Sequence, residues 1–238
     1  METNDLTARP PQIIAIDGPA ASGKTTVGVE LAKELGFLCL DTGIMYRATT
    51  WQALTDGLDP EDEAAITRLA ESIEIDVLPG SVDDGRAFDV LINHQDHTWD
   101  IRKPDVNQHV SLISSYPGVR NAMTLQQRKI AARGKIVMLG RDIGTVVLPD
   151  ADLKIYLDAS LRVRAKRRYE EEKARGNAIT YQSVVASLRR RDKIDSSRKF
   201  APLKIADDAL VINTDALSVV QVVEKIKALI AARKSSLE

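Results

Sequence analysis

The sequence predicts a doubly wound α/β domain, and three observations lead to this fold class. Five short runs are apolar at consecutive positions, as expected for strands buried on both faces of a parallel sheet. Stretches with helical periodicity fall between these runs. The first run leads directly into a glycine-rich loop and a helix. The chain has 238 residues, 44% of them hydrophobic, which is enough for one such domain with an insertion.

The elements follow in chain order. The expected strands are residues 13–17, 37–41, 135–139, 153–157 and 209–213. A stripe of Val27, Leu31 and Leu35 predicts a helix after the first strand. Ser160 and Ser218 are placed to cap two later helices.

The middle of the chain interrupts the alternation of strands and helices. Two strand patterns flank the turn-rich segment 79–85, PGSVDDG, after a helix that begins near Asp59. We therefore expect an inserted subdomain at 58–115 with a small antiparallel sheet. Residues 1–57 and 116–238 would form the core domain.

The loop after the first strand carries the most specific local motif. Its sequence GPAASGKT matches G-x-x-x-x-G-K-[ST] from Gly18 to Thr25. In this pattern backbone N–H groups surround a phosphate chain and Lys24 adds a positive charge. The Thr25 hydroxyl is offered to Mg²⁺. The alternative is an ordinary glycine-rich turn, but the flanking strand and helix favour nucleotide binding.

The second expected strand also ends in polar residues. Asp41 and Thr42 lie at its carboxyl end, the edge where open α/β sheets hold ligands. Tyr46 and Arg47 follow one helical turn later. Arg47 can bind a phosphate through two nitrogens, although alone it could equally lie on a solvated helix face.

Two more groups of charges extend this pattern. Arg141 and Asp142 follow the third strand and should reach the same edge. Arg191, Asp195 and Arg198 are spaced to share one helical face. An intrahelical ion pair of Asp195 with Arg191 is the alternative explanation for part of this spacing.

Composition excludes several classes of protein. The net charge of −1 gives no global field for a nucleic acid, no apolar run is long enough to span a membrane, and no signal-peptide pattern is present. The single cysteine, Cys39, fits a core position in a reducing compartment. The three histidines suggest neither a metal site nor a catalytic triad. We therefore expect a cytoplasmic protein with no nucleic-acid or membrane partner.

Together these motifs resemble the bacterial cytidylate kinase family over nearly the whole chain. The matching stretches include IAIDGPAASGKTT, LDTGIMYRA, GRDIGTVVLPDADLKI and RRRDKIDSSRKFAPL. The resemblance implies transfer of the γ-phosphoryl group of ATP, with Mg²⁺, to CMP or dCMP. It also implies a P-loop nucleoside monophosphate kinase fold with sheet order 2-3-1-4-5, a nucleoside-monophosphate-binding insert, a helical lid at about 162–180 and a monomeric state.

The resemblance further implies a role for each matching position. ATP would be held by Gly18, Pro19, Ala20, Ala21, Ser22, Gly23, Lys24, Thr25 and Thr26. CMP would be held by Thr42, Tyr46, Arg47, Ser111, Arg120, Arg141, Asp142, Arg191, Asp195 and Arg198. Within this set, Arg47, Arg141 and Arg198 would bind the phosphate. Ser111, Arg120 and Asp142 would read cytosine, and Asp195 would contact the sugar. Catalysis would rest on Lys24, Arg141, Arg191 and Arg198.

Two positions depart from the family pattern. The family usually has an acidic residue, near the Mg²⁺, just before GRDIG, and here Leu139 takes its place. Thr25 would then bind Mg²⁺, with Asp17 or Asp142 as a candidate carboxylate acting through water. Ala21 stands where the family often has glycine, which is tolerable if its φ is negative.

Three alternatives remain at this point. The acceptor could be UMP or another small molecule, which Ser111, Arg120 and Asp142 argue against. The chain could be a nucleotide-binding module with little turnover, which Leu139 alone favours. A nucleic-acid-dependent ATPase is disfavoured by the balanced charge.

Overall fold

The structure is a computed structural model that describes residues 11–86 and 88–235. Its main sheet consists of five parallel strands: β1 (Ile13–Asp17), β2 (Leu38–Asp41), β6 (Ile136–Gly140), β7 (Leu153–Asp158) and β8 (Leu210–Asn213). Their order across the sheet is β2-β6-β1-β7-β8. Counted along the chain within this sheet, that is 2-3-1-4-5, so the predicted order is confirmed.

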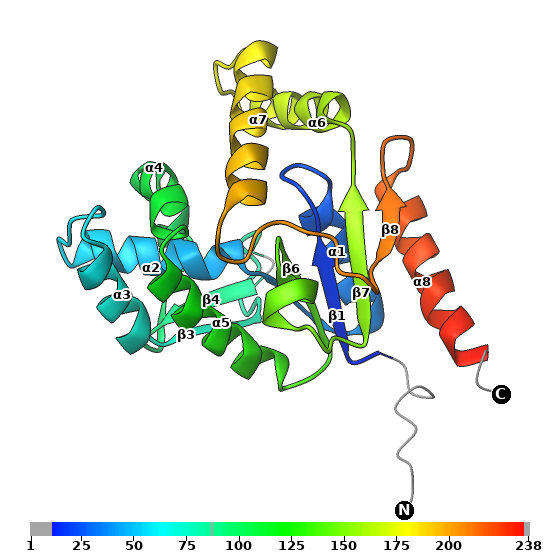
Figure 1. The fold of residues 1–238 in the computed structure, drawn as a ribbon, viewed down its shortest axis with the longest axis horizontal. Helices are drawn as coiled ribbons and strands as arrows, with labels where there is room; N and C mark the ends of the chain where they lie inside the picture. Colours follow the sequence, from blue (N-terminus) through cyan, green and yellow to red (C-terminus); the bar gives the residue numbers. More distant parts are fainter. Residues whose placement is uncertain (1–10, 87, 236–238) are drawn as a thin grey trace, which may run out of the picture.

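Helices cover both faces of this sheet (Figure 1). The helices α1 (Lys24–Leu35) and α8 (Val219–Ser235) pack on one face, with Ile14 and Ile16 of β1. The helices α2 (Gly43–Thr55) and α5 (Pro117–Ala131) pack on the other, with Ala15 of β1. Successive residues of a strand point to opposite faces, so a strand covered on both sides must be apolar throughout.

The segment between α2 and α5 contains a three-stranded antiparallel sheet, as its strand patterns predict. Its elements are α3 (Glu63–Ser72), β3 (Ile75–Pro79), β4 (Phe88–Ile92), β5 (Gln95–Asp96), the 3₁₀ helix η1 (Asp100–Arg102) and α4 (Pro104–Ile113). Its apolar side joins the core formed by α2 and α5, where Val77 and Val90 lie in one cluster with Met123. We keep residues 58–115 as a proposed subdomain.

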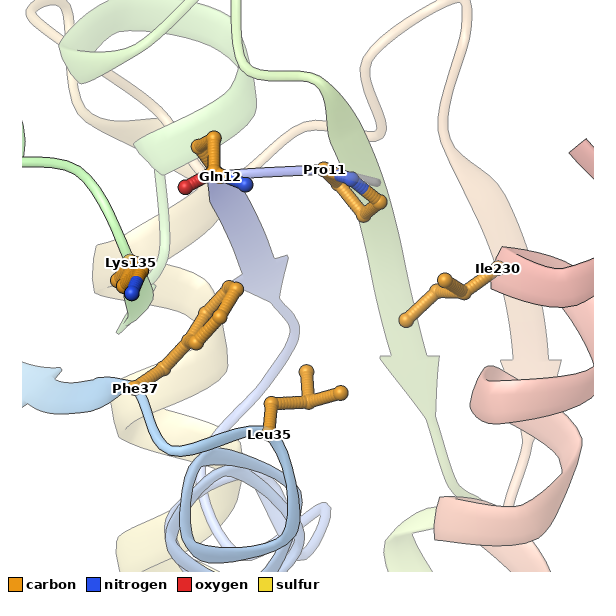
Figure 2. Close-up of a pocket in the computed structure, with 6 residues that line it drawn as sticks. All are labelled: Pro11, Gln12, Leu35, Phe37, Lys135 and Ile230. Atoms are coloured by element: carbon orange, nitrogen blue, oxygen red, sulfur yellow. The ribbon is translucent and has the colours of Figure 1, made fainter. Parts of the chain in front are cut away.

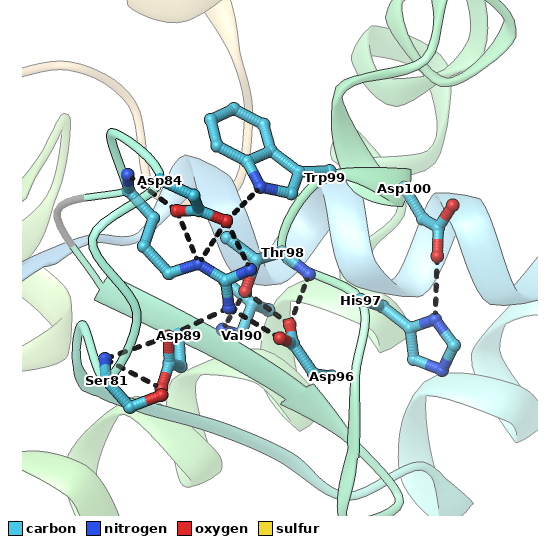
Figure 3. Close-up of polar contacts among 10 residues, drawn as sticks. Ser81, Asp84, Asp89, Val90, Asp96, His97, Thr98, Trp99 and Asp100 are labelled. Carbon is cyan, nitrogen blue, oxygen red and sulfur yellow. Dashed lines mark hydrogen bonds and ion pairs between the residues drawn. The ribbon is translucent and has the colours of Figure 1, made fainter.

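A single guanidinium ties this small sheet to its turn. Arg86 forms ion pairs with Asp84, Asp89 and Asp96, and its side chain is 8% exposed. Figure 3 shows that Trp99 closes over the same cluster, its Nε1 donating to Asp84 Oδ2 at 2.9 Å. The acidic turn is therefore held by charges from the hairpin rather than by an apolar core.

Two helices rise at the carboxyl end of the main sheet, α6 (Leu161–Ala174) and α7 (Tyr181–Ser197) (Figure 1). They pack on each other and on the phosphate-binding loop in a small apolar cluster that contains Ala20, Ala165 and Leu188. Because α7 ends at Ser197, only the first two of the three residues expected on one helical face lie on the helix. Arg198 follows it in extended conformation.

The opposite end of the sheet carries an apolar hollow between α1 and α8. Its lining includes Leu35, Phe37 and Ile230 (Figure 2). It lies at the amino ends of the strands, far from the predicted ligand edge. Among the described residues, no helix combines the length and the apolar character needed to cross a membrane.

Candidate active site

The phosphate-binding loop joins β1 to α1 and depends on two glycines. Gly18 has φ of 149°, and a Cβ there would overlap the Leu157 carbonyl oxygen. Gly23 has φ of 96° at the start of α1. Only glycine adopts such backbone geometry without strain, so the first and last glycines of the motif are required by the loop itself.

Ala21 also has a positive φ, 60°. The condition under which the extra methyl group would be tolerated, a negative φ, is therefore not met. The loop turns left-handed here, and the methyl group of Ala21 is accommodated at a conformational cost.

Lys24 lies inside this loop. Its Nζ donates to the carbonyl oxygens of Gly18 and Pro19, both at 2.7 Å. Burial, and then the charge of Arg141, lower the pKa of Lys24 well below its usual value. An anion placed beside Lys24 would stabilise its charged form, which is the electrostatic requirement of a phosphate site.

Four arginines from three parts of the chain face the same region. Arg47 comes from α2 and Arg141 follows β6, while Arg191 lies near the end of α7 and Arg198 directly follows that helix. Burial and the charge of Arg141 lower the pKa of Arg191, while burial and the charge of Arg120 lower that of Arg198.

Only part of this positive charge is balanced by protein carboxylates. Asp195 accepts from Arg141 Nε at 2.9 Å and lies 3.8 Å from Arg198. Asp195 thus pairs with Arg141 from another part of the chain and lies near Arg198, rather than forming the intrahelical ion pair with Arg191 that its spacing would allow. The remaining excess of arginines favours a polyanion at this position.

A buried ion pair lies beside these arginines. Arg120 of α5 donates to Asp142 Oδ2 at 2.7 Å, and the two residues are 3% and 5% exposed. The guanidinium also lies over the ring of Tyr46, 5.3 Å from its centroid. Burial raises the pKa of the Tyr46 phenol, which therefore stays protonated as a hydrogen-bond donor.

The other predicted acceptor-site residues border this pair less directly. Thr42 is buried, and its hydroxyl donates to the Leu139 carbonyl at 2.9 Å. Ser111 is exposed on α4. It lies one helical turn after Asn107, whose Oδ1 accepts from Arg47 Nη1 at 2.7 Å. Asn107 is a contact that no sequence motif indicated.

Asp17 is hydrogen-bonded to the backbone that follows Arg141. Its two carboxylate oxygens accept the backbone N–H groups of Ile143 and Gly144, at 2.9 and 2.7 Å. These residues begin the short π-helix η2 (Ile143–Val147). Asp17 thus positions the segment that follows Arg141, and burial raises its pKa to about 6. The structure gives no support to Asp17 as the carboxylate of a metal site.

The acid beside Thr25 is Asp41. Its Oδ2 accepts from Thr25 Oγ1 at 2.9 Å, and its Oδ1 accepts from the N–H of Gly43 at 3.0 Å. The sequence places Asp41 at the end of a strand, but nothing local in it indicates that Asp41 faces Thr25.

Two arginines of α6 contact the phosphate-binding loop region. Arg164 donates to the Ala20 carbonyl at 3.1 Å and pairs with Asp192 of α7 at 2.7 Å. Arg167 donates to Thr214, whose hydroxyl in turn donates to the Ser22 carbonyl at 3.2 Å. The resemblance implies a helical lid in this segment, but nothing in the local sequence indicates these two partners.

Comparison with known proteins gives a consistent result. The family model described as cytidylate kinase matches residues 14–232. A cytidylate kinase of Roseiflexus castenholzii is 49% identical over 94% of this chain and 95% of its own length. One of Bacillus velezensis is 47% identical over 90% and 93%. A solved structure of an uncharacterized protein from Eubacterium ventriosum covers 92% of this chain and 98% of its own at TM-score 0.51 and 13% identity, which supports the fold alone.

Proposed function

This chain belongs to the cytidylate kinase family, and we propose that it transfers the γ-phosphoryl group of ATP to CMP or dCMP, giving ADP and CDP or dCDP. The observation that carries the proposal is the convergence of Lys24 with arginines from α2, α7 and the β6–η2 loop at one sheet edge. The buried Arg120–Asp142 pair lies directly beside them.

The arrangement suits phosphoryl transfer between two nucleotides. A monophosphate oxygen is already anionic, so the acceptor needs positioning rather than a strong base. Arg47, Arg141 and Arg198 would hold the CMP phosphate. Lys24 and Arg191 would stabilise the charge that develops on the transferred group. The scarcity of histidine near the site is consistent with this chemistry.

The base would be selected by the buried pair. Cytosine offers an N4 donor beside N3 and O2 acceptors, whereas uracil has the opposite polarity at positions 4 and 3. Asp142 accepts and Arg120 donates, so together they match cytosine. A mismatched base would leave buried polar groups without partners, which discriminates strongly.

The segment at about 162–180, which contains most of α6, would act as the lid. Arg164 connects α6 and α7 to the carbonyl of Ala20, so a movement of the lid is coupled to the ATP loop. Closing over the phosphates would exclude water and prevent simple hydrolysis of ATP. We keep the lid at about 162–180 as proposed, and the proposed catalytic residues Arg191 and Arg198 lie beyond it.

The residues present also fit a nucleotide-bound Mg²⁺. Thr25 lies exposed at the start of α1, with a carboxylate oxygen 2.9 Å from its hydroxyl. Oxygen donors of this kind suit Mg²⁺. When bound, the ion would neutralise charge on the ATP phosphates.

We further propose that the enzyme is a cytoplasmic monomer. Size-exclusion chromatography with light scattering tests the oligomeric state.

A coupled assay of ADP release tests the function. The protein is given Mg-ATP with CMP, dCMP, UMP, AMP or no acceptor. Fast release with CMP and dCMP alone is the expected result. Equal ADP release with UMP would show that the acceptor is not restricted to CMP and dCMP. No acceptor-dependent release, in protein that still binds ATP, would favour a binding module instead.

A further inference from the structure

We propose that Asp41 is the one protein carboxylate that contacts nucleotide-bound Mg²⁺ in this enzyme, in place of the acid absent at Leu139. The assignment rests on the proposed function, because it requires ATP at the phosphate-binding loop. It goes beyond that function by naming how this chain compensates for its departure from the family pattern.

The first argument is the position of the Asp41 carboxylate. One oxygen, Oδ2, lies 2.9 Å from the hydroxyl of Thr25, the residue expected to bind the ion. The other oxygen is fixed by the N–H of Gly43 at 3.0 Å. The carboxylate is therefore held in one orientation next to an exposed hydroxyl, as a metal ligand or a holder of metal-bound water requires.

The second argument is the register of the sheet. Asp41 of β2 lies directly beside Leu139 of β6, so their side chains project from the same face. That face carries α1, where a Cβ on Gly28 would come 2.5 Å from Leu139 Cδ2. Leu139 is 1% exposed and fills its position with hydrocarbon. Asp41 is thus the neighbour of the position where the family has its acid.

The third argument is that the other two candidate carboxylates are engaged elsewhere. Asp17 lies on the opposite face of the sheet, where it accepts two backbone N–H groups of η2. Asp142 is paired with Arg120. Among the described residues, no group of three or more His, Cys, Asp or Glu side chains could hold a metal. The ion would take its remaining ligands from phosphates and water.

The charges around Asp41 place it between the two substrates. Its negative charge interacts with the charge of Lys24 on the ATP side. It also interacts with the charges of Arg47 and Arg191 on the acceptor side. A cation beside Asp41 would therefore lie near the junction of the donor and acceptor phosphates, where charge must be neutralised during transfer.

The test measures Mn²⁺ binding to the complex of full-length protein with ADP by electron paramagnetic resonance, with Mn²⁺ as the probe for Mg²⁺. Asp41→Asn keeps the size of the side chain and an acceptor for the N–H of Gly43. We expect it to weaken Mn²⁺ binding at least tenfold while metal-free ADP binding changes less than threefold. The matched control is Asp158→Asn at the end of β7, whose carboxylate accepts from the N–H of Ala159, and it should leave Mn²⁺ affinity unchanged.

A second variant tests the exchange of positions. Leu139→Asp in the Asp41→Asn background places a carboxylate on the neighbouring strand at the same level, and it should recover part of the lost Mn²⁺ affinity. The Asp41→Asn result stands without this variant if the buried aspartate prevents folding.

Two results would overturn the assignment. Unchanged Mn²⁺ affinity in Asp41→Asn would remove Asp41 from the metal site. An equal loss of metal-free and metal-dependent ADP binding would show that Asp41 only shapes the loop. Wild-type protein that fails to bind ADP would instead refute the proposed function itself, so the two failures are distinguishable.

Discussion

At position 21 the phosphate-binding loop carries a methyl group on a left-handed backbone, with φ of 60°. A residue with a Cβ pays roughly 1–2 kcal/mol for this conformation. Glycine avoids that cost, but it raises the conformational entropy of the unfolded chain, which lowers the free energy of unfolding by about 0.4–1 kcal/mol. The two effects oppose each other, and the strain is the larger.

We therefore expect Ala21→Gly to raise the free energy of unfolding by about 0.5–1 kcal/mol. Urea denaturation followed by circular dichroism measures it. Ala20→Gly, the same change one residue earlier at a position without positive φ, should destabilise the protein. A loss of stability in both variants would contradict the strain argument.

Asp17 illustrates how a buried carboxylate changes stability with pH. Burial raises its pKa from 3.8 to about 6, so the folded state binds the proton more tightly than the unfolded state. The stabilising contribution of protonated Asp17 to the free energy of unfolding is complete below pH 3.8, and it is lost as pH rises through about 6. The size of this change is about 3 kcal/mol.

Asp17→Asn removes this titration. The free energy of unfolding of wild-type protein, minus that of the variant, should fall by up to about 3 kcal/mol between acidic and neutral pH. Groups that titrate in both proteins cancel in the difference. Denaturation curves at several pH values provide the measurement, and a difference that does not vary with pH would be incompatible with the raised pKa.

At the scale of elements, the small antiparallel sheet depends on one polar network. Arg86 connects Asp84 in the turn, Asp89 in β4 and Asp96 in β5. Its guanidinium thereby holds three carboxylates together that would otherwise repel one another. The helix α4, which supplies Asn107, follows this hairpin in the chain.

Arg86→Gln removes these ion pairs and should make local opening of the β3–β4–β5 sheet more frequent. Hydrogen–deuterium exchange should become faster for amides between residues 81 and 98, while β1, β6 and β7 keep their protection. The control is Arg133→Gln, whose guanidinium pairs with Asp76 of the same sheet but is 50% exposed, and it should change exchange little. Uniform loss of protection across the main sheet would mean that the network supports the whole fold instead.

On the scale of the whole molecule, the site is assembled from parts that are distant in the chain. Arg47 and Asn107 approach it from α2 and α4, and Arg191 approaches it from α7. Figure 1 shows α4 and α7 rising at the same end of the main sheet. Phosphates that bind cationic side chains of α2 on one side and of α7 on the other would draw these helices together.

We expect ADP and CMP together to make the molecule more compact. Small-angle X-ray scattering should give a smaller radius of gyration with both nucleotides than with ADP alone. UMP in place of CMP serves as the control and should give little of the change, because we propose that the Arg120–Asp142 pair selects cytosine. An unchanged radius with saturating ADP and CMP would argue against closure of the two sides.

Local patterns were sufficient for much of this molecule. Consecutive apolar residues indicate the five strands because both faces of the sheet are covered, and the glycines of the phosphate-binding loop are imposed by their own backbone geometry. The resemblance supplied the strand order. Long-range geometry decided the rest: the partner of Asp195 is Arg141, and the acid beside Thr25 is Asp41 rather than Asp17. Which side chains meet at a sheet edge depends on register and on the face each strand end presents, and neither is encoded within a short stretch of sequence.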